Sequence, residues 1–501
     1  WSMCNESNYT RLFKMTQQYI KMVDPTRPSS GSYAPETDKA DFVVEHHPTN
    51  LNQYIRSRAG VPKPVFMDEC QTVFHGWGDL AVSLELDPGM HDYWVDRVPD
   101  VIRASFETEN QVGTMIWAWV DDAFWVPGRG IGYWRRDMTP IRYMDAIYGG
   151  PGHGYVGDCA WGVVDAWRRP RPEWELCRQV YSPMQIPTAP LEPGPVRVPV
   201  SNQNVFENLK IYECRWALAG KSGVLRADVP PRASGTITIP AEAQPDDSLE
   251  LQFFDGKRLV NSFRLPFRAR PAEEWTMGQP AGIAEEPPDR YLSGASVVYL
   301  RGGACELAYE RKSGELMWGL AADNQVLFKG PRLHVLKSEA PAGEDPAGWK
   351  FSGETHGDGF VRWNGSFGND WTGGYEIRLD RDGHAEFGYE FTYHGPDLWV
   401  RELGLKFDLP LAFRRLEWER RAEYTVYQDD HIGRPHGIAL AHSDPLQLVP
   451  PGARPFALDD HAWGSNDFRS AKRGVYWASL SGAWGAVKVV SDGSQTVRCT
   501  L

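Results

Sequence analysis

The sequence predicts a multi-domain chain in which part of an α/β (TIM) barrel is followed by two β-sandwich domains. The chain has 501 residues, more than one ordinary domain holds, and 42% of them are apolar, enough for several cores. Up to about residue 181, strand-like runs alternate with amphipathic helices, whereas helical periodicity nearly disappears beyond a proline-rich stretch. We therefore predict a barrel portion in residues 1–181, a linker with an immunoglobulin-like β-sandwich in 182–280, and a large β-sandwich in 281–501.

The composition excludes several classes of function. The net charge of -13 is spread along the chain and the basic residues form no stripe, which opposes nucleic-acid binding. No apolar run reaches the length of a membrane span, so we predict a soluble protein with no membrane partner, in a compartment that the sequence leaves open. The seven cysteines lie far apart without a CxxC pair, which argues against a zinc site or a disulfide framework. The 21 Trp, 20 Tyr and 21 Phe fit either sugar-binding faces or aromatic sandwich cores.

The predicted barrel portion begins with a helix and continues with three strands. The run "YTRLFKMTQQYIKMVD" (9–24) has its apolar residues close to a 3.6-residue period, and "DPTRP" follows as a turn built on proline. Strand-like runs then recur at "ADFVVEHHP" (40–48), "KPVFMDEC" (63–70) and "QVGTMIWAWVDD" (111–122). Each run ends in polar or aromatic residues, which is where a barrel places its chemistry.

The remaining residues read as all-β. The stretch "SPMQIPTAPLEPGPVRVPVS" is predicted to be a linker, because neither a helix nor a central strand tolerates so much proline. Short alternating strands of an immunoglobulin-like sandwich are expected at "LKIYECRWAL", "SGTITIP" and "SLELQFF". A second proline-rich break, "AGIAEEPPDR", precedes the large sandwich, with strands such as "GYEIRL", "AEFGYEFTYH" and "GVYWASL".

Two glutamates at predicted strand ends are the candidate catalytic pair. Retaining hydrolysis of a glycosidic bond needs one carboxyl that protonates the leaving oxygen and one that attacks the anomeric carbon. Glu6 follows "WSMCN" and Glu69 follows "PVFMD", and the 63 residues between them allow about three barrel strands. Asn5 strengthens the pair, because its amide can hydrogen-bond the sugar hydroxyl next to the anomeric carbon. Asp68 points to the opposite face of an ideal strand, so we expect it to support Glu69 rather than react.

Four motifs, in order, carry a family resemblance. "WSMCNES", "DPTRP", "KPVFMDEC" and "GTMIWAWVDD" look like strands four to eight of the catalytic barrel of glycoside hydrolase family 2. Downstream, "NVFENLKIYECRWAL" resembles the second immunoglobulin-like domain of the long β-galactosidases of that family. "CELAYERKSGELMWGLAADNQVLFKGPRL" resembles the opening of their large C-terminal sandwich. The resemblance covers nearly the whole chain, with its last two domains matching in pattern more than in identity.

The resemblance implies a role for each candidate residue. Glu6 would be the acid/base on the fourth strand and Glu69 the nucleophile on the seventh. Trp117 would be the sugar platform, Asp121 matches the family pattern, and His47 would replace a tyrosine that hydrogen-bonds the nucleophile. The expected reaction is hydrolysis of terminal β-D-galactosides in oligosaccharides by double displacement. For the neighbours of these residues, we expect Trp119 to be packing and Arg27 to anchor an ion pair.

The chain departs from the family pattern at several positions. Glu69 is followed by Cys70, Gln71 and Thr72, where β-galactosidases commonly carry a tyrosine and then a histidine. This difference leaves two alternatives open: another sugar, such as a glucuronide or a plant or algal galactan, and a non-catalytic sugar-binding remnant. The asparagine of the family's sodium site is absent, and only Glu6 remains of its magnesium ligands, so no cofactor or metal is assigned.

The resemblance also implies that the chain enters the barrel at its fourth strand. The expected partners are then a carbohydrate substrate and either a further copy of the chain or an N-terminal barrel half supplied in trans, because an unclosed barrel leaves sheet edges uncovered.

Overall fold

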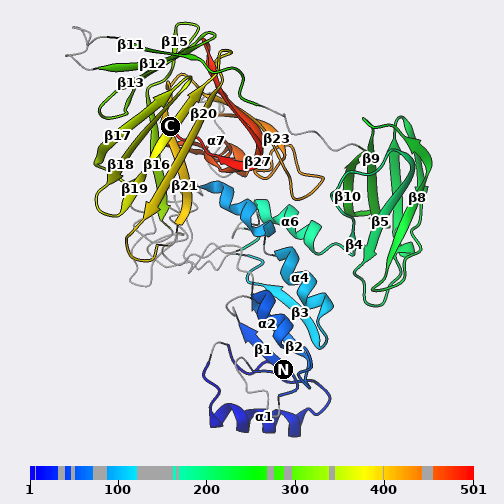
Figure 1. Ribbon diagram of the computed structural model, residues 1–501. Coiled ribbons are helices and arrows are strands. Elements are labelled where there is room, and N and C mark those ends of the chain that lie inside the picture. Colours follow the sequence, from blue (N-terminus) through cyan, green and yellow to red (C-terminus); the bar gives the residue numbers. More distant parts are fainter. Residues whose placement is uncertain are drawn as a thin grey trace, which may run out of the picture.

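The computed structural model describes most of the chain. It covers residues 1–5, 7–31, 40–46, 51–70, 87–96, 98–120, 162–164, 168, 170–267, 276–286, 296–337, 345–398, 400–442 and 455–501. Figure 1 shows a small α/β part near the N-terminus, a separate two-layered sandwich, and a larger β part that contains the C-terminus. No helix in the described ranges is long and apolar enough to cross a membrane.

The α/β part contains a three-stranded parallel sheet. Its strands β1 (Val43–His46), β2 (Val65–Cys70) and β3 (Gln111–Ile116) follow one another in sequence order across the sheet. Parallel neighbours need crossovers, which contain the helices α2 (Leu51–Ser57) and α4 (Val98–Glu107). The core between sheet and helices consists of Val43, Ile55, Val65, Met67, Val101 and Ala104. The predicted βα units are therefore confirmed, while a closed barrel stays a prediction.

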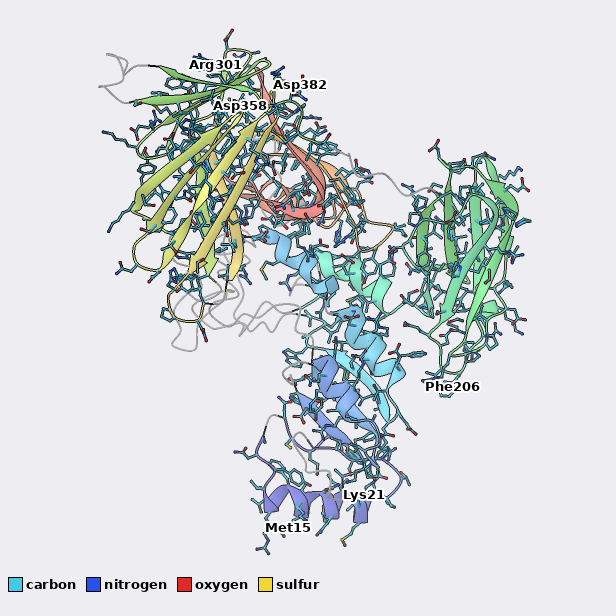
Figure 2. All side chains as sticks on the ribbon, viewed as in Figure 1. Met15, Lys21, Phe206, Arg301, Asp358 and Asp382 are labelled. Atoms are coloured by element: carbon cyan, nitrogen blue, oxygen red, sulfur yellow. The ribbon has the colours of Figure 1, made fainter. Side chains whose placement is uncertain are left out.

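A helix precedes this sheet, as predicted. Helix α1 spans Arg11–Val23, and a parallel bridge joins Ser2 to Ser30 on either side of it. Its apolar side chains face outward: Leu12, Met15, Tyr19 and Met22 are each more than half exposed, and Figure 2 shows Met15 at the outer edge of the molecule. A salt bridge joins the helix to the chain that follows it, because Lys21 Nζ lies 2.7 Å from the Asp41 carboxylate.

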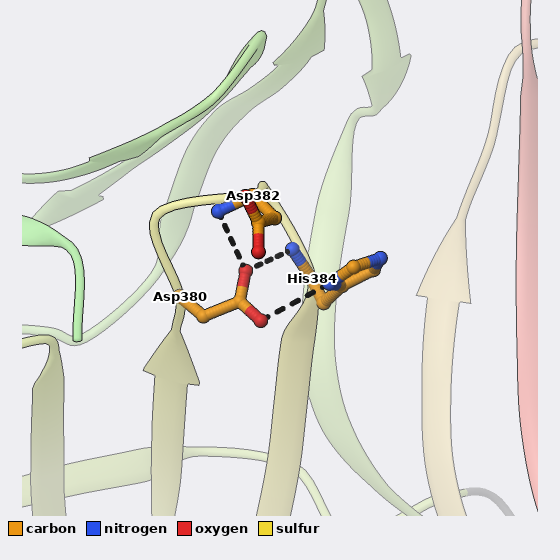
Figure 3. Close-up of side chains that lie close together, drawn as sticks. All are labelled: Asp380, Asp382 and His384. Atoms are coloured by element: carbon orange, nitrogen blue, oxygen red, sulfur yellow. Dashed lines mark hydrogen bonds and ion pairs between the residues drawn. The ribbon is translucent and has the colours of Figure 1, made fainter. Parts of the chain in front are cut away.

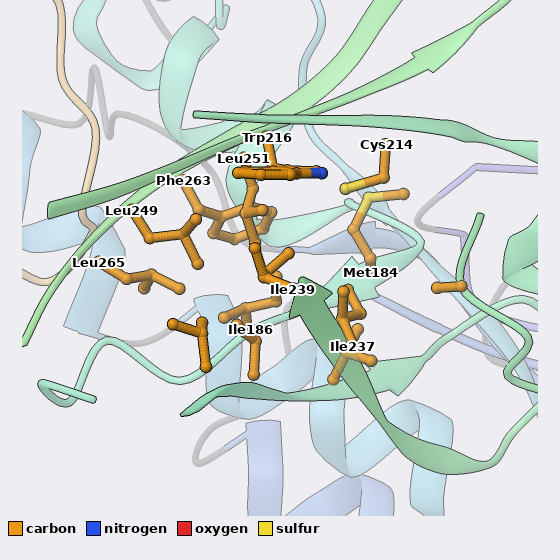
Figure 4. Packing of buried hydrophobic residues seen from close by; sticks show 14 of the residues in the cluster. Met184, Ile186, Cys214, Trp216, Ile237, Ile239, Leu249, Leu251, Phe263 and Leu265 are labelled. Atoms are coloured by element: carbon orange, nitrogen blue, oxygen red, sulfur yellow. The ribbon is translucent and has the colours of Figure 1, made fainter. Parts of the chain in front are cut away.

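The middle part is a β-sandwich of two sheets, at the place where the sequence predicted an immunoglobulin-like one, and we keep that name for it. One sheet has the strand order β4 (Met184–Gln185), β5 (Gly194–Asn202) and β8 (Ser234–Ala243). The other sheet has the strand order β10 (Arg258–Pro266), β9 (Ser248–Asp255), β6 (Glu213–Leu218) and β7 (Lys221–Leu225). A short 3-10 helix, η2 (Leu209–Ile211), precedes β6. Inward-facing apolar residues of both sheets interdigitate, among them Trp216, Ile239 and Leu251 (Figure 4).

The linker prediction is wrong where β5 begins. Strand β5 runs through Pro195 and Pro199, inside the stretch that the sequence assigned to a linker. Its partner β8 lies along one side, while β4 pairs only with Ser201 and Asn202 on the other. The proline positions therefore lie where one edge of the strand is open and needs no donor, which is where a sheet tolerates proline. The second break is likewise partly a strand, β11 (Gly282–Glu286).

The C-terminal part is strand-rich throughout. Its first sheet joins β11 to β12 (Val297–Gly302), β13 (Cys305–Glu310), β14 (Leu316–Ala321) and β15 (Asn324–Leu327). A second contains β17 (Trp349–Gly357), β18 (Phe360–Phe367), β19 (Trp371–Leu379) and β20 (Ala385–Tyr393). β16 (Lys329–Lys337) pairs with β21 (Val400–Asp408). One buried cluster, which includes Leu307, Tyr309, Trp363 and Ile377, joins the first two sheets, as expected of a sandwich.

The last sheet contacts the α/β part. Its strands follow the order β23 (His436–Leu440), β22 (Arg415–Arg420), β26 (Lys472–Ser481) and β27 (Ala486–Val497). The chain between β23 and β26 forms four short elements: η4 (Phe456–Leu458), β24 (Asp460–His461), β25 (Gly464–Ser465) and α7 (Asn466–Arg469). The contact is made by the 3-10 segment η1 (Pro88–Asp96) and by α6 (Pro172–Val180). Arg420 donates to the Asp92 carboxylate at 3.0 Å, and the backbone N–H of Ala471 donates to Asp87 at 2.8 Å.

Candidate active site

Glu69 lies near the carboxyl end of β2, the central strand of the parallel sheet. The pairing with β1 is regular up to Glu45, which pairs with Met67, and then skips one residue, so that His46 pairs with Glu69. Asp68 is the extra residue of this irregularity. A bulge of this kind re-aims the side chains next to it, and bulges are frequent beside active sites. The simple alternation expected from the sequence therefore does not hold at Asp68 and Glu69.

Both carboxyl groups contact the same histidine. His46 Nε2 lies 2.7 Å from Asp68 Oδ1, and His46 Nδ1 lies 3.5 Å from Glu69 Oε2. The histidine ring is fully buried, and Glu69 is only 9% exposed. Burial raises the pKa of Asp68, which the positive charge and hydrogen bond of His46 oppose. Asp68 thus contacts His46, and its supporting role at the site stays a prediction.

A tyrosine is positioned on the other side of β1. The Tyr54 hydroxyl, from α2, donates to Glu45 Oε2 at 2.7 Å. Burial and the neighbouring Glu45 carboxylate raise the pKa of Tyr54 well above its usual range. Tyr54 therefore stays a neutral donor and anchors helix α2 to the strand that carries His46.

The tryptophans after β3 are placed differently from each other. Trp117 is half-buried and is joined to Ala118 by a cis peptide bond. It packs against the same buried cluster as Tyr424 and Tyr427 from the C-terminal part. Trp119 was expected to be packing, but it is 55% exposed and lies with its ring centroid 4.9 Å from that of Trp174 in α6. The alternation of β3 ends at Ile116, so strand periodicity does not govern Trp119.

The structure places only part of the predicted site. Glu6, His47 and Asp121 lie outside the described residues, so the distance between Glu6 and Glu69 stays a prediction. Asn5 is described and exposed, and its backbone carbonyl accepts a hydrogen bond from Ser7 Oγ at 2.8 Å. Arg27 contacts Asp24 at 2.6 Å, which confirms the ion pair expected in the "DPTRP" turn.

Sequence reasoning missed two features of the site. His46 and His47 both end the predicted strand; His46 lies beside Glu69, whereas His47, which the family pattern favours, lies outside the described residues and stays a prediction. The register shift at Asp68, which pairs His46 with Glu69, could not be predicted from the local sequence. The aromatic residues Tyr424 and Tyr427 lie about 300 residues further along the chain than Trp117, so only the tertiary structure brings them to its cluster.

One group of side chains in the described residues has the composition of a metal site. Asp380, Asp382 and His384 lie on the turn between β19 and β20, with ligand atoms within 4.8 Å of one another (Figure 3). The Asp380 carboxylate, however, already accepts hydrogen bonds from the backbone N–H groups of Gly278, Asp382 and His384 and contacts the His384 ring at 3.0 Å. Burial opposes its ionisation, but these hydrogen bonds lower the pKa of Asp380 to about 2. The group therefore closes a turn, and we assign no metal to it.

Comparisons with known proteins give distant likenesses only. No protein-family model matches the chain, and no curated protein sequence matches it. An endo-beta-1,4-mannanase from Thermotoga petrophila is 14% identical, with a TM-score of 0.16, over 50% of this chain and 59% of that one. An exo-chitosanase from Amycolatopsis orientalis is 11% identical, with a TM-score of 0.18, over 72% of this chain and 47% of that one. Both are glycoside hydrolases, and the chain spans less than two thirds of the length of either.

Proposed function

We propose that the chain is part of a retaining exo-β-glycosidase that hydrolyses terminal β-D-galactosides by double displacement. Glu69 is the nucleophile and Glu6 the acid/base. One observation carries the proposal: a nearly buried carboxylate lies near the carboxyl end of the central strand of a parallel sheet, next to a buried histidine. Catalytic groups of α/β enzymes lie at that edge of the sheet.

In the proposed reaction, Glu69 attacks the anomeric carbon while Glu6 gives its proton to the leaving oxygen. The glycosidic bond breaks and a covalent glycosyl-enzyme forms. Glu6 then takes a proton from water as the water oxygen attacks the anomeric carbon, which breaks the bond to Glu69 and releases the sugar with its original anomeric configuration. This chemistry requires the two carboxyl groups to be about 5–5.5 Å apart. Asn5 would bind the neighbouring sugar hydroxyl and Trp117 the apolar face of the ring.

His46 supplies the electrostatic setting for the nucleophile. An attacking carboxylate must be ionised, although burial favours its neutral form. The His46 ring lies 2.7 Å from Asp68 Oδ1 and 3.5 Å from Glu69 Oε2, so a polar ring rather than an apolar side chain borders the proposed nucleophile. His46 is thus a positioning residue that acts through Glu69, while the resemblance gives the hydrogen bond to the nucleophile to His47.

Hydrolysis of a panel of aryl β-glycosides tests the proposal. We expect turnover of the galactoside, and we expect Glu69→Gln and Glu6→Gln each to reduce kcat by at least about a thousandfold, because each removes a reacting group. Glu109→Gln is the matched control, since Glu109 is an exposed glutamate just before β3. Turnover of a glucuronide or another glycoside instead would correct the sugar and keep the mechanism. Full activity of Glu69→Gln, or binding of sugar without turnover of any glycoside, would contradict the catalytic assignment.

A further inference from the structure

A polar cavity of about 490 Å³ lies where the C-terminal sheet meets the α/β part. Asp92 of η1 forms one wall, the residues that follow β22 form another, and β26 and β27 supply the rest. The volume is within the range of small-molecule sites. The cavity is lined by three arginines, Arg420, Arg421 and Arg473, and we call it the arginine cavity.

Two of the three arginines form the frame of the cavity. Arg420 is almost completely buried, and it donates to the Asp92 carboxylate at 3.0 Å and to the backbone carbonyls of Arg434 and Ile432. Arg473 donates to the Asp92 backbone carbonyl at 3.1 Å and lies 3.6 Å from its carboxylate. The contacts with Asp92 cross the interface between the two parts, and they hold in place the wall that carries Arg421.

Arg421 is the arginine that is available to a ligand. Its backbone N–H donates to the Gly474 carbonyl at 2.8 Å, which holds its Cα at the wall of the cavity. Its side chain is exposed, and within the described part of the structure its guanidinium has no hydrogen-bond or ion-pair partner. A guanidinium presents several donors in a planar fork that matches a carboxylate or sulfate group. The protein as a whole carries a charge of -13, which repels anions. An anion that binds in the cavity is therefore held by its contacts with the lining residues and not by the overall charge of the protein.

The cavity also offers hydroxyl groups and a carboxylate. Ser494 and Thr496 of β27 line it and are exposed, and Glu423 adds a carboxylate. Gly474 also lines it; its φ is +63°, and a Cβ built on it would be in ordinary van der Waals contact with Arg421 Cβ, at 3.4 Å. Hydroxyls and a carboxylate that share a cavity with a guanidinium can exchange hydrogen bonds with a ligand that carries both hydroxyl groups and an oxyanion.

We propose that the arginine cavity binds the oxyanion of an acidic sugar, either the carboxylate of a uronic acid or a sulfate ester, with Arg421 as its principal contact. The oxyanion requirement rests on the cavity alone, whereas the sugar requirement rests also on the proposed function. The arginine cavity is separate in its residues from the Glu69 site, so binding here does not need catalysis.

Calorimetric titration of the full chain tests the proposal, with glucuronic acid, galactose 6-sulfate, neutral galactose and inorganic sulfate as probes. We expect saturable binding of the two acidic sugars and weaker binding of inorganic sulfate, and we expect binding of neutral galactose, at the Glu69 site, to be unchanged by Arg421→Gln. Arg421→Gln should weaken binding of the acidic sugars at least tenfold, because a charge-assisted hydrogen bond is lost. Arg197→Gln, an exposed arginine of the immunoglobulin-like sandwich, is the matched control and should change nothing.

A second variant keeps the test independent of charge and of catalysis. Thr496→Trp fills the cavity on an exposed position of β27 and should abolish binding without altering the arginines. The titrations are repeated in Glu69→Gln, where binding should persist, so failure of the proposed hydrolysis leaves this result unaffected. Binding of the acidic sugars that survives both Arg421→Gln and Thr496→Trp would place the ligand elsewhere, and an equal loss of galactose and acidic-sugar binding in Arg421→Gln would refute the oxyanion requirement.

Discussion

A single backbone irregularity determines which carboxyl groups His46 contacts. In a regular strand, Asp68 and Glu69 would face opposite sides and only one of them would reach the neighbouring strand's histidine. Because the pairing skips Asp68, the same buried imidazole contacts both carboxyl groups, at 2.7 and 3.5 Å. The surroundings of the proposed nucleophile therefore include a residue that the family pattern did not single out.

A second histidine, His334 on β16, predicts a pH dependence of stability. Its ring contacts Asp345 at 2.6 Å and Glu402 at 2.9 Å, and these two hydrogen bonds raise the pKa of His334 from 6.5 to about 9. The stabilisation is fully present below the unfolded-state pKa of 6.5 and is lost as the pH rises through about 9.

Urea unfolding across this pH range measures the effect. We expect the free energy of unfolding to fall by about 1–3 kcal/mol between the two pKa values, the lower figure allowing for screening by water. His334→Gln removes the titrating group, so its free energy of unfolding should show no such fall. A wild-type curve parallel to that of His334→Gln would contradict the assignment.

Among the elements, β5 depends on a single side-chain amide at its end. Asn202 is 1% exposed, and its Nδ2 donates to the carbonyls of Glu207, Val229 and Pro230 at 2.9–3.0 Å. Its Oδ1 accepts from the Asn204 N–H at 2.9 Å. These contacts join the strand to the loops beside it, where no strand pairing satisfies the carbonyls.

Replacing that amide should destabilise the immunoglobulin-like sandwich. We expect Asn202→Ala to lower the free energy of unfolding by about 2–4 kcal/mol, because four hydrogen bonds of one buried amide are lost at once. Lys221→Ala, at an exposed position of β7 in the same sandwich, should change it by less than about 0.5 kcal/mol. Chemical denaturation monitored by circular dichroism measures both, and equal effects of the two substitutions would refute the role given to Asn202.

For the whole molecule, the contact between the α/β part and the C-terminal sheet is the one that holds these two parts together. Asp92 and Arg420 are 328 residues apart in the sequence, and both side chains are nearly buried where they meet. His431 Nε2 donates to the Pro172 carbonyl in the same interface, at 2.9 Å. A buried pair of this kind costs desolvation energy to form, but breaking one side leaves the other charge buried and unpaired.

We therefore expect Asp92→Asn to lower the free energy of unfolding by about 3–5 kcal/mol. The matched control is Asp255→Asn, which breaks the exposed Arg258–Asp255 pair at 2.8 Å and should cost at most about 1 kcal/mol. Urea unfolding followed by tryptophan fluorescence measures both variants. If Asp92→Asn is no more costly than Asp255→Asn, the pair does not hold the two parts together.

The sequence by itself determined the local organisation of this protein. The 3.6-residue period of residues 9–24 predicted helix α1, and alternating apolar residues predicted strands such as β6, β8 and β9. Strand ends rich in polar residues also pointed to Glu69, because side-chain type and strand position are both local properties. The proline content wrongly predicted a linker where β5 lies, because a strand tolerates proline along an edge that is not paired with another strand.

Only the tertiary structure decided which residues from distant segments contact one another. The register shift at Asp68 brings Glu69 to His46, and the packing of distant segments brings Tyr424 to the cluster of Trp117 and Arg420 to Asp92. Periodicity records which face of an element is apolar, and it carries no information about which distant element covers that face. The predicted residues were therefore local, whereas the partners that give them their chemistry come from pairing and packing between segments far apart in the chain.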